Sequence, residues 1–381
     1  MNIRIDKKEI PVLLLTGYLG SGKTTLLNRI LQNRKGIRFA VIVNDIGEVN
    51  IDADLIQKGG IVGQTDDSLV ALQNGCICCT LKMDLVAQLA ELCASSKFDY
   101  IVIEASGICE PAPIAQTIST MPALAPQYAL NTLPYVDSIV TVVDALRMKD
   151  EFALGESLQK EDIGEDDLER LVIEQVEFCN IVLLNKAAEI APEELKVLTG
   201  IVKGINPAAK VLACNYGDID LDEIIYTGMF DFERVATSAA WIAAIEGEDE
   251  EEEEAEGEAL EYGIGTFVYY RRGALDLNKF DHFVARSWPD TVIRAKGLCY
   301  FSDDIDKCYL FEQAGRQKML RDAGLWYAAM EEEELQEMMD RDWRLRRDWD
   351  PLWGDRMQKI VFIGRNMDTE DLQNRLDACL A

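Results

Sequence analysis

Histidine, basic side chains and long apolar runs are all scarce in this chain of 381 residues. The only histidine is His282, and one histidine inside a predicted helix indicates packing rather than metal ligation. No apolar run approaches the roughly 20 residues that a membrane-spanning helix needs, which argues against a membrane partner. The chain begins without the apolar core of a signal peptide, so we expect a cytoplasmic protein.

Acidic residues outnumber basic ones, 68 to 38, which gives a net charge of −30. Such a chain would repel nucleic-acid phosphates, so a nucleic-acid partner is not expected. Ten of the acids lie between Glu246 and Glu258, with no base among them. Like charges in a row repel each other and extend the chain, so this stretch is predicted to be a disordered linker.

Ten cysteines are spread along the chain, and three of them, Cys76, Cys78 and Cys79, fall within four positions. A long chain without an export signal indicates a reducing compartment in which thiols stay free. Thiolates at this spacing converge only in a tight loop, which the preceding Gly75 permits. Such a set favours Zn²⁺ or Co²⁺, and three ligands leave one position open, as suits a transferable ion. The alternatives are buried apolar thiols or a redox pair made by Cys78 and Cys79.

Short apolar runs alternate with helical patterns over about the first 235 residues. The runs are rich in Val, Ile and Leu, as expected for strands of a parallel sheet that is covered on both faces. Strands are predicted at residues 12–16, 39–43, 100–104, 139–144, 181–185 and 210–213, and helices at 24–31, 83–93 and 193–203. This order predicts an α/β domain with a doubly wound, mostly parallel sheet that binds ligands at the carboxyl ends of its strands.

A smaller domain of the α+β class is predicted beyond the acidic stretch. Its strands are expected at residues 265–270, 308–312 and 359–363, and its helices at 277–285 and 331–342. The predicted organisation is therefore a first domain over residues 1–235, a linker over 236–261 and a second domain over 262–381.

A phosphate-binding loop with the spacing G-x4-G-K-T lies between a predicted strand and a predicted helix, which is the context that this motif requires. Its candidate nucleotide-binding residues are Gly17, Gly20, Ser21, Gly22, Lys23 and Thr24. The glycines allow the backbone to close round a phosphate with its N–H groups pointing inward. Lys23 is the candidate catalytic cation near the outer phosphates, and the Thr24 hydroxyl can complete a Mg²⁺ shell. The sequence therefore predicts a nucleoside triphosphatase fold.

A second candidate element follows the strand predicted at residues 100–104. Glu104 ends this strand, and a carboxylate there, next to the phosphate loop, can hold Mg²⁺ or orient a water molecule. Gly107, three residues later, would let its backbone N–H approach a γ-phosphate closely. Glu104 is therefore a second catalytic candidate, and Gly107 a further nucleotide-binding one.

Together these residues resemble the CobW-like family of metal-chaperone GTPases, relatives of the nickel-inserting GTPases of urease and hydrogenase maturation. The resemblance extends over nearly the whole chain, and the cysteine motif is its most specific part. The matching segments are residues 17–25 for the phosphate loop with Thr25, 44–48 for the first switch, 75–79 for the cysteine motif, 104–107 with 110–111 for the second nucleotide motif, and 294–297 with 349–364 in the second domain.

The resemblance implies GTP hydrolysis with Mg²⁺, coupled to binding of Zn²⁺, Co²⁺ or a related ion and its delivery to a client metalloprotein. Asp45 joins Thr24 and Glu104 as a magnesium candidate, and Glu48 joins the three cysteines as a ligand candidate. Either Asp45 or Glu48 would be placed to sense both Mg²⁺ and the thiolate-bound ion, and the sequence leaves both possibilities open.

The guanine-reading motif of the family matches Asn185 and Lys186, but Ala188 stands where the family has an aspartate. That carboxylate accepts hydrogen bonds from the guanine edge, and a charge-assisted bond contributes roughly 1.5–3 kcal/mol. Its loss is expected to lower the preference for GTP by roughly one or two powers of ten, unless Glu189 substitutes. The linker, often His-rich in the family, is acidic here, which weakens a role in metal storage.

Two other functions fit the same residues. One is a metal-buffering or regulatory binding protein with a weak or degenerate nucleotide site, which the alanine at position 188 motivates. The other is a thiol-based redox sensor on a nucleotide-binding scaffold, with reversible oxidation of Cys78 and Cys79.

Overall fold

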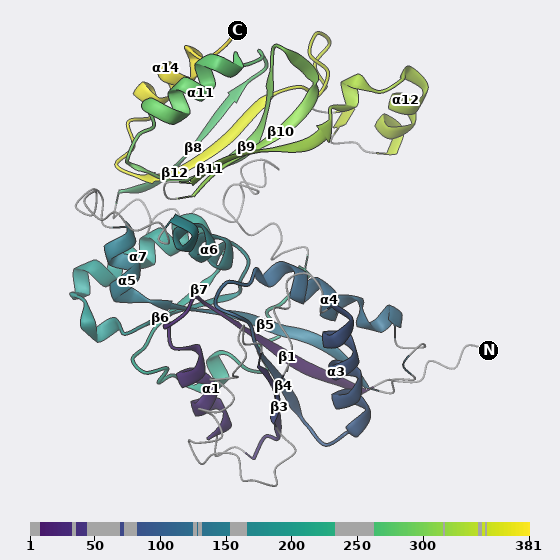
Figure 1. Cartoon of the computed structure of the whole chain (residues 1–381), viewed down its shortest axis with the longest axis vertical. Coiled ribbons are helices and arrows are strands. Elements are labelled where there is room, and N and C mark those ends of the chain that lie inside the picture. The colour runs from purple at the N-terminus through teal and green to yellow at the C-terminus, as the bar shows by residue number, and fades with distance from the viewer. Residues whose placement is uncertain are drawn as a thin grey trace. The chain divides into compact units, whose positions relative to one another are not determined.

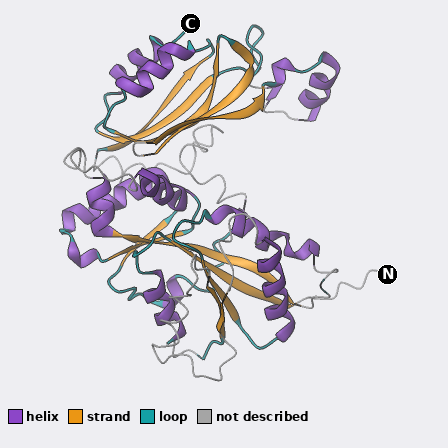
Figure 2. Cartoon of the chain, viewed as in Figure 1, coloured by secondary structure: helices purple, strands orange, loops and turns teal. Residues whose placement is uncertain are grey.

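The chain forms two compact units, each built around its own β-sheet (Figures 1 and 2). The computed structural model describes residues 8–32, 36–43, 69–71, 82–124, 128, 132–152, 166–232, 263–314, 317–341, 345–346 and 349–381. The expected linker, 236–261, lies outside these ranges, so its predicted boundaries stay a prediction.

The first unit holds a seven-stranded sheet in the order β3-β2-β4-β1-β5-β6-β7, and every pair in it is parallel. The strands are β1 (Lys8–Thr16), β2 (Phe39–Val43), β3 (Leu69–Ala71), β4 (Tyr100–Glu104), β5 (Thr132–Asp144), β6 (Ile181–Asn185) and β7 (Lys210–Ala213). Because all strands run in the same direction, their carboxyl ends lie together, and the connections that follow the strands all begin at that end of the sheet.

Helices alternate with these strands. They are α1 (Lys23–Leu31), α3 (Lys82–Ser95), α4 (Pro111–Leu124), α5 (Ala145–Phe152), α6 (Asp166–Glu177) and α7 (Pro192–Ile205). Leu26, Leu27 and Ile30 of α1 are fully buried in a cluster with Leu13 and Leu15 of β1. The helices α3 and α4 pack against each other and against β5 (Figure 1).

The predicted doubly wound α/β fold is confirmed. The strands expected at 39–43, 100–104, 181–185 and 210–213 coincide with β2, β4, β6 and β7. The pattern missed the three-residue β3 and the helices α4, α5 and α6. A strand of three residues is too short to show a periodicity, and α4 contains none of the charged residues that usually mark the exposed face of a surface helix.

The second unit holds a five-stranded antiparallel sheet in the order β11-β10-β9-β12-β8. Its strands are β8 (Ile264–Arg271), β9 (Val292–Phe301), β10 (Asp304–Ala314), β11 (Gln317–Leu325) and β12 (Gln358–Arg365), and its helices are α11 (Leu277–Arg286), α12 (Glu332–Arg341) and α14 (Thr369–Asp377). Phe280 and Phe283 of α11 and Leu372 and Leu376 of α14 share one apolar core with the sheet. The predicted α+β class is confirmed.

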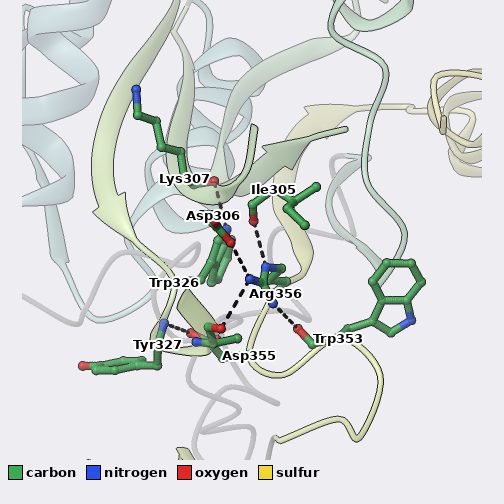
Figure 3. Close-up of polar contacts among 9 residues, drawn as sticks. Ile305, Asp306, Lys307, Trp326, Tyr327, Trp353, Asp355 and Arg356 are labelled. Atoms are coloured by element: carbon green, nitrogen blue, oxygen red, sulfur yellow. Dashed lines mark hydrogen bonds and ion pairs between the residues drawn. The ribbon is translucent and has the colours of Figure 1, made fainter. Parts of the chain in front are cut away.

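Arg356 connects separate turns of this second unit (Figure 3). Its Nε donates to the Ile305 carbonyl at 2.8 Å, and its Nη2 donates to Asp306 Oδ1 at 2.7 Å. The neighbouring Asp355 carboxylate accepts the backbone N–H groups of Tyr327 and Ala328, both at 2.8 Å. These bonds give residues 353–356 a structural role, because they join this stretch to the start of β10 and to the 3-10 turn Tyr327–Ala329 that follows β11.

Candidate functional site

The phosphate loop connects β1 to α1, as the motif requires. Gly17, Gly20 and Gly22 all have positive φ angles, of 132°, 84° and 108°. Gly22 is the N-cap of α1, and a Cβ atom there would come within 2.3 Å of Asn185 Nδ2. Only glycine combines this left-handed conformation with such close packing, so the loop geometry depends on this residue type.

Lys23 and Thr24 begin α1 and lie beside the loop. The Lys23 ammonium is only 8% exposed and donates to the carbonyls of Gly17, at 2.7 Å, and Tyr18, at 3.2 Å. The Thr24 hydroxyl donates to Glu104 Oε1 at 3.1 Å. Thr25, the next residue, is exposed. The structure thus brings Lys23, Thr24 and Glu104 to the same end of the sheet.

Glu104 lies at the carboxyl end of β4 and is 2% exposed. Its carboxylate and the Thr24 hydroxyl are hard oxygen donors within hydrogen-bond distance of each other, which is the donor chemistry that Mg²⁺ prefers. The residues therefore fit a nucleotide-bound magnesium ion. Asp45, the third magnesium candidate, lies outside the described residues.

Gly107 packs directly against the phosphate loop. A Cβ atom at this position would come within 2.7 Å of the Leu19 backbone nitrogen, so the segment after β4 approaches the loop as only glycine allows. Just before it, Ala105 N–H donates to the Leu15 carbonyl at 2.9 Å, which continues the pairing of β4 with β1. The contact of the Gly107 N–H with a γ-phosphate stays a prediction.

Asn185 is the last residue of β6, Lys186 follows it, and the Asn185 side chain holds two loops together. Asn185 Nδ2 donates to the Ser21 carbonyl at 2.9 Å, and its Oδ1 accepts the Gly217 N–H at 3.2 Å. The Lys186 ammonium pairs with the Asp144 carboxylate. Asn185 therefore joins the phosphate loop to the turn after β7, and its role in reading the base stays a prediction.

Ala188 is exposed and belongs to the short 3-10 turn Ala187–Glu189. Its backbone N–H donates to Asn215 Oδ1 at 2.8 Å, and the N–H of Ala187 donates to the Cys214 carbonyl at 3.1 Å. The turn is held by its backbone, and the side chain at position 188 offers no acceptor.

Three residues around the site are not among the candidates that the sequence motifs identify: Tyr18, Asp144 and Gln175. The Tyr18 hydroxyl donates to the Asp144 carbonyl at 3.1 Å and accepts the Asp144 N–H at 3.0 Å. Arg147 lies 5.2 Å above the Tyr18 ring. Gln175 donates to the segment after β4 from a helix 66 residues further along the chain. These residues are far apart in the sequence and come together only in the folded chain, so no local sequence signal identifies them.

The candidate ligands of the soft metal, Cys76, Cys78, Cys79 and Glu48, lie outside the described residues. Within the ranges that the structure describes, no group of three or more His, Cys, Asp or Glu side chains could hold a metal ion. No helix in these ranges is long and apolar enough to cross a membrane.

The seven isolated cysteines are core residues. All of them are buried thiols that form no disulfide: Cys93, Cys109, Cys179, Cys214, Cys299, Cys308 and Cys379. Burial raises the pKa of Cys93 and of Cys179 to about 12, so these thiols stay protonated and are poor ligands. The expectation that His282 packs in a core was wrong. It is exposed on α11, because this helix buries Phe280 and Phe283 instead.

Comparison with known proteins agrees with the motifs. Residues 11–213 match the family described as CobW/HypB/UreG, nucleotide-binding domain, and residues 264–380 match the cobalamin synthesis protein cobW C-terminal domain. "Zinc-regulated GTPase metalloprotein activator 1" of Dictyostelium discoideum is 34% identical over 388 residues, which cover 98% of this chain and 80% of that protein. "Zinc chaperone YjiA" of Escherichia coli is 28% identical, with 96% of each chain covered.

A solved structure of Zn(II)-bound YjiA GTPase from E. coli covers 98% of this chain and all of its own, with 22% identity and a TM-score of 0.41. The two matched segments and the Dictyostelium relative establish the membership. The chain belongs to the CobW/HypB/UreG nucleotide-binding family and carries the cobW C-terminal domain.

Proposed function

We propose that the protein is a nucleotide-dependent metallochaperone that hydrolyses GTP and binds Zn²⁺ or Co²⁺ for delivery to a client metalloprotein. The observation that carries the proposal is the register of the parallel sheet. Ala71 pairs with Val43, Val43 with Glu104, and Glu104 with Leu15. The strand before the cysteines, the strand before the first switch and the strand before the phosphate loop therefore end in one row.

Distances along this row support communication between the two sites. Neighbouring strands lie about 4.8 Å apart, so Ala71 and Glu104 are separated by about 10 Å. Cys76 follows Ala71 by five residues, and Glu48 follows Val43 by five. Five residues span at most about 17 Å. Both candidate ligands are therefore within reach of the nucleotide site, and α3 returns the chain at Lys82.

Hydrolysis would use residues that the structure describes. Lys23 would neutralise charge on the outer phosphates. Glu104 would orient a water molecule whose oxygen attacks the γ-phosphorus, while the bond to the β–γ bridging oxygen breaks and GDP and phosphate leave. Thr24 and Glu104, with Asp45, would hold Mg²⁺, which when bound neutralises charge on the β- and γ-phosphates.

Metal transfer would follow from a change in the γ-phosphate contact. Gly107 lies against the phosphate loop, and the row at the end of the sheet joins it to the connections that carry Glu48 and the cysteines. Loss of the γ-phosphate would then alter the geometry of the thiolates and weaken their hold on the ion. By thermodynamic linkage, the metal must change nucleotide affinity by the same factor.

The test is a calorimetric titration of the reduced protein with Zn²⁺ and with Co²⁺, in the presence of a non-hydrolysable GTP analogue, GDP or no nucleotide. We expect stoichiometric binding whose affinity differs between the two nucleotide states. The triple change of Cys76, Cys78 and Cys79 to Ser should abolish it, whereas Cys93→Ala, at a buried thiol of α3, should not. Equal affinity in all nucleotide states would refute the delivery mechanism.

A metal-buffering protein without turnover is the second candidate, and the exposed Ala188 is the observation that favours it. Without an acceptor for the guanine edge, the site could hold nucleotide weakly and hydrolyse none. Phosphate release from GTP and from ATP, with and without Zn²⁺, separates the two candidates. Turnover that Lys23→Ala abolishes supports the chaperone, and its absence for both nucleotides supports the buffer.

A further inference from the structure

Gln175 is a fully buried glutamine of α6 that holds the segment after β4. Its Nε2 donates to the Cys109 carbonyl at 3.2 Å and to the Gly107 carbonyl at 3.5 Å. Its Oε1 is buried and makes no hydrogen bond within the described part of the chain. The two carbonyls assign the orientation of the amide, because a flipped amide would place Oε1 against both of them.

The segment that Gln175 holds is the one that lies against the phosphate loop. Gly107 faces the backbone of Tyr18 and Leu19 on one side, where a Cβ atom would be only 2.7 Å from the Leu19 nitrogen. Cys109 is 1% exposed and closes a turn by donating its N–H to the Ser106 carbonyl at 3.0 Å. The segment is thus fixed between the phosphate loop and α6.

The backbone of Gln175 connects to the strand that leads into the phosphate loop. Its carbonyl accepts the Thr141 hydroxyl at 2.9 Å, and the hydroxyls of Thr141 and Thr16 lie 2.8 Å apart. All three residues are fully buried. Thr16 is the last residue of β1, directly before the loop. Gln175 is therefore connected to both segments that flank the expected γ-phosphate position. Its backbone is linked through Thr141 to the end of β1, and its side chain binds the segment after β4.

We propose that Gln175 is a positioning residue that holds Gly107 against the phosphate loop, so that the site distinguishes a triphosphate from a diphosphate. This inference rests on the proposed function, because it requires the protein to bind GTP. The Gly107 N–H is the group that a γ-phosphate would meet, and a diphosphate does not reach it. Loss of the Gln175 donors frees the segment, which weakens binding of the triphosphate but leaves binding of the diphosphate unchanged.

The unused Oε1 supports a positioning role over a purely structural one. A buried amide oxygen without a donor destabilises the fold, and an apolar side chain of the same length would avoid this cost. A site that only needed filling would be served better by methionine. An amide is needed at this position because its two N–H donors bind the carbonyls of Gly107 and Cys109, in the segment beside the γ-phosphate position.

The test compares Gln175→Met with Gln358→Met. Gln358 is the matched control, since it is also fully buried and its Nε2 donates to two carbonyls, of Gly273 at 3.0 Å and Tyr300 at 2.9 Å, in the second unit. Affinities for GDP and for a non-hydrolysable GTP analogue are measured by calorimetry. We expect Gln175→Met to weaken analogue binding by about tenfold relative to GDP, the equivalent of one hydrogen bond of about 1.4 kcal/mol. Gln358→Met should leave this ratio at its wild-type value.

A second variant, Gln175→Glu, repeats the test with a readout in pH. An ionised carboxylate would face the carbonyls of Gly107 and Cys109, whereas a protonated one regains an O–H donor. Burial raises the pKa of such a carboxyl. The preference for the GTP analogue should therefore recover as the pH falls from 8 towards 5.5, relative to the wild type at each pH.

The results separate the two levels of the proposal. A wild-type protein that binds no GTP overturns the proposed function itself. A wild-type protein that binds GTP, with an unchanged ratio of analogue to GDP affinity in folded Gln175→Met or a pH-independent ratio in Gln175→Glu, overturns the role of Gln175 alone.

Discussion

Ala188→Asp should restore guanine preference to this site. The turn at 187–189 is held by two of its backbone N–H groups. Ala188 N–H donates to Asn215 Oδ1 and Ala187 N–H donates to the Cys214 carbonyl, so a new side chain at position 188 does not need the turn to move. An aspartate there could accept hydrogen bonds from N1–H and the 2-amino group of guanine. Charge-assisted bonds contribute about 1.5–3 kcal/mol, which corresponds to about 10- to 150-fold in affinity.

The exposure of Ala188 decides where in this range the effect falls. Water competes for an exposed carboxylate, so we expect the lower end, a gain of about tenfold for GDP over ADP. The assay is displacement of a fluorescent nucleotide by GDP, IDP and ADP. Because IDP lacks only the 2-amino group, the ratio of GDP to IDP isolates the bond to that group.

A matched control is Ala187→Asp, which adds the same charge one residue earlier in the turn. It should leave the ratio of GDP to ADP unchanged. If Ala188→Asp also leaves the ratio unchanged, the base does not meet this turn and the reasoning fails. If the wild-type protein already prefers GDP to IDP strongly, another acceptor reads the base, and Glu189→Gln should then remove the preference.

Two further predictions concern stability. Tyr100→Phe removes the hydroxyl that donates to the buried Asp137 carboxylate at 2.5 Å, and should lower the free energy of unfolding in urea by about 1.5–3 kcal/mol; a change below about 0.5 kcal/mol would contradict this. Arg38 holds the pKa of Asp99 at about 2, below its ordinary 3.8, chiefly through a side-chain hydrogen bond. A lowered carboxyl pKa stabilises the fold above pH 3.8 and loses this effect as the pH falls towards 2. Both side chains are partly exposed, 58% and 35%, so the effect is small, and the melting temperatures of wild type and Asp99→Asn should differ slightly at pH 6 and converge near pH 2.

Most of the first sheet could be predicted because its strands are buried on both faces. β4 and β6 are continuous apolar runs that end in Glu104 and Asn185, so both the strand and its candidate functional residue stand out in the sequence. The phosphate loop combines fixed spacing with a strand before it and a helix after it. An element can be predicted from sequence alone where its own composition and the elements before and after it indicate the same structure.

The second sheet was harder to predict because its strands break the apolar pattern. β9 contains Arg294 and Lys296, yet Arg294 is 1% exposed and lies 3.7 Å from Glu312 on β10. Lys296 approaches the same carboxylate at 2.8 Å. A cation can occupy a buried strand only when a partner on the next strand compensates its charge, and that partner is invisible to a reading of β9 alone.

The site residues that were missed share this dependence on distant partners. Gln175 has no motif around it, and its helix is separated from the Gly107 segment by the whole of α4, β5 and α5. Tyr18 lies inside the phosphate-loop motif at a position the motif leaves open, and its hydroxyl contacts are to Asp144, 126 residues away. Motifs identify residues that meet the ligand, whereas the residues that hold them in place are found only in the fold.

The proposed control of a metal site by a nucleotide would need no long pathway through this sheet. Glu104 bonds to Thr24 on the phosphate-loop side, and its Cα partner on the other side is Val43, the last residue before the candidate first switch. Val43 in turn pairs with Ala71, from which the cysteine segment departs. A change at the γ-phosphate therefore needs to pass only two strand spacings, about 10 Å, to reach the root of the cysteine segment. Coupling over so short a row requires a group at the phosphate end that contacts the γ-phosphate, and the segment that Gln175 holds against the loop is the one that the γ-phosphate would meet first.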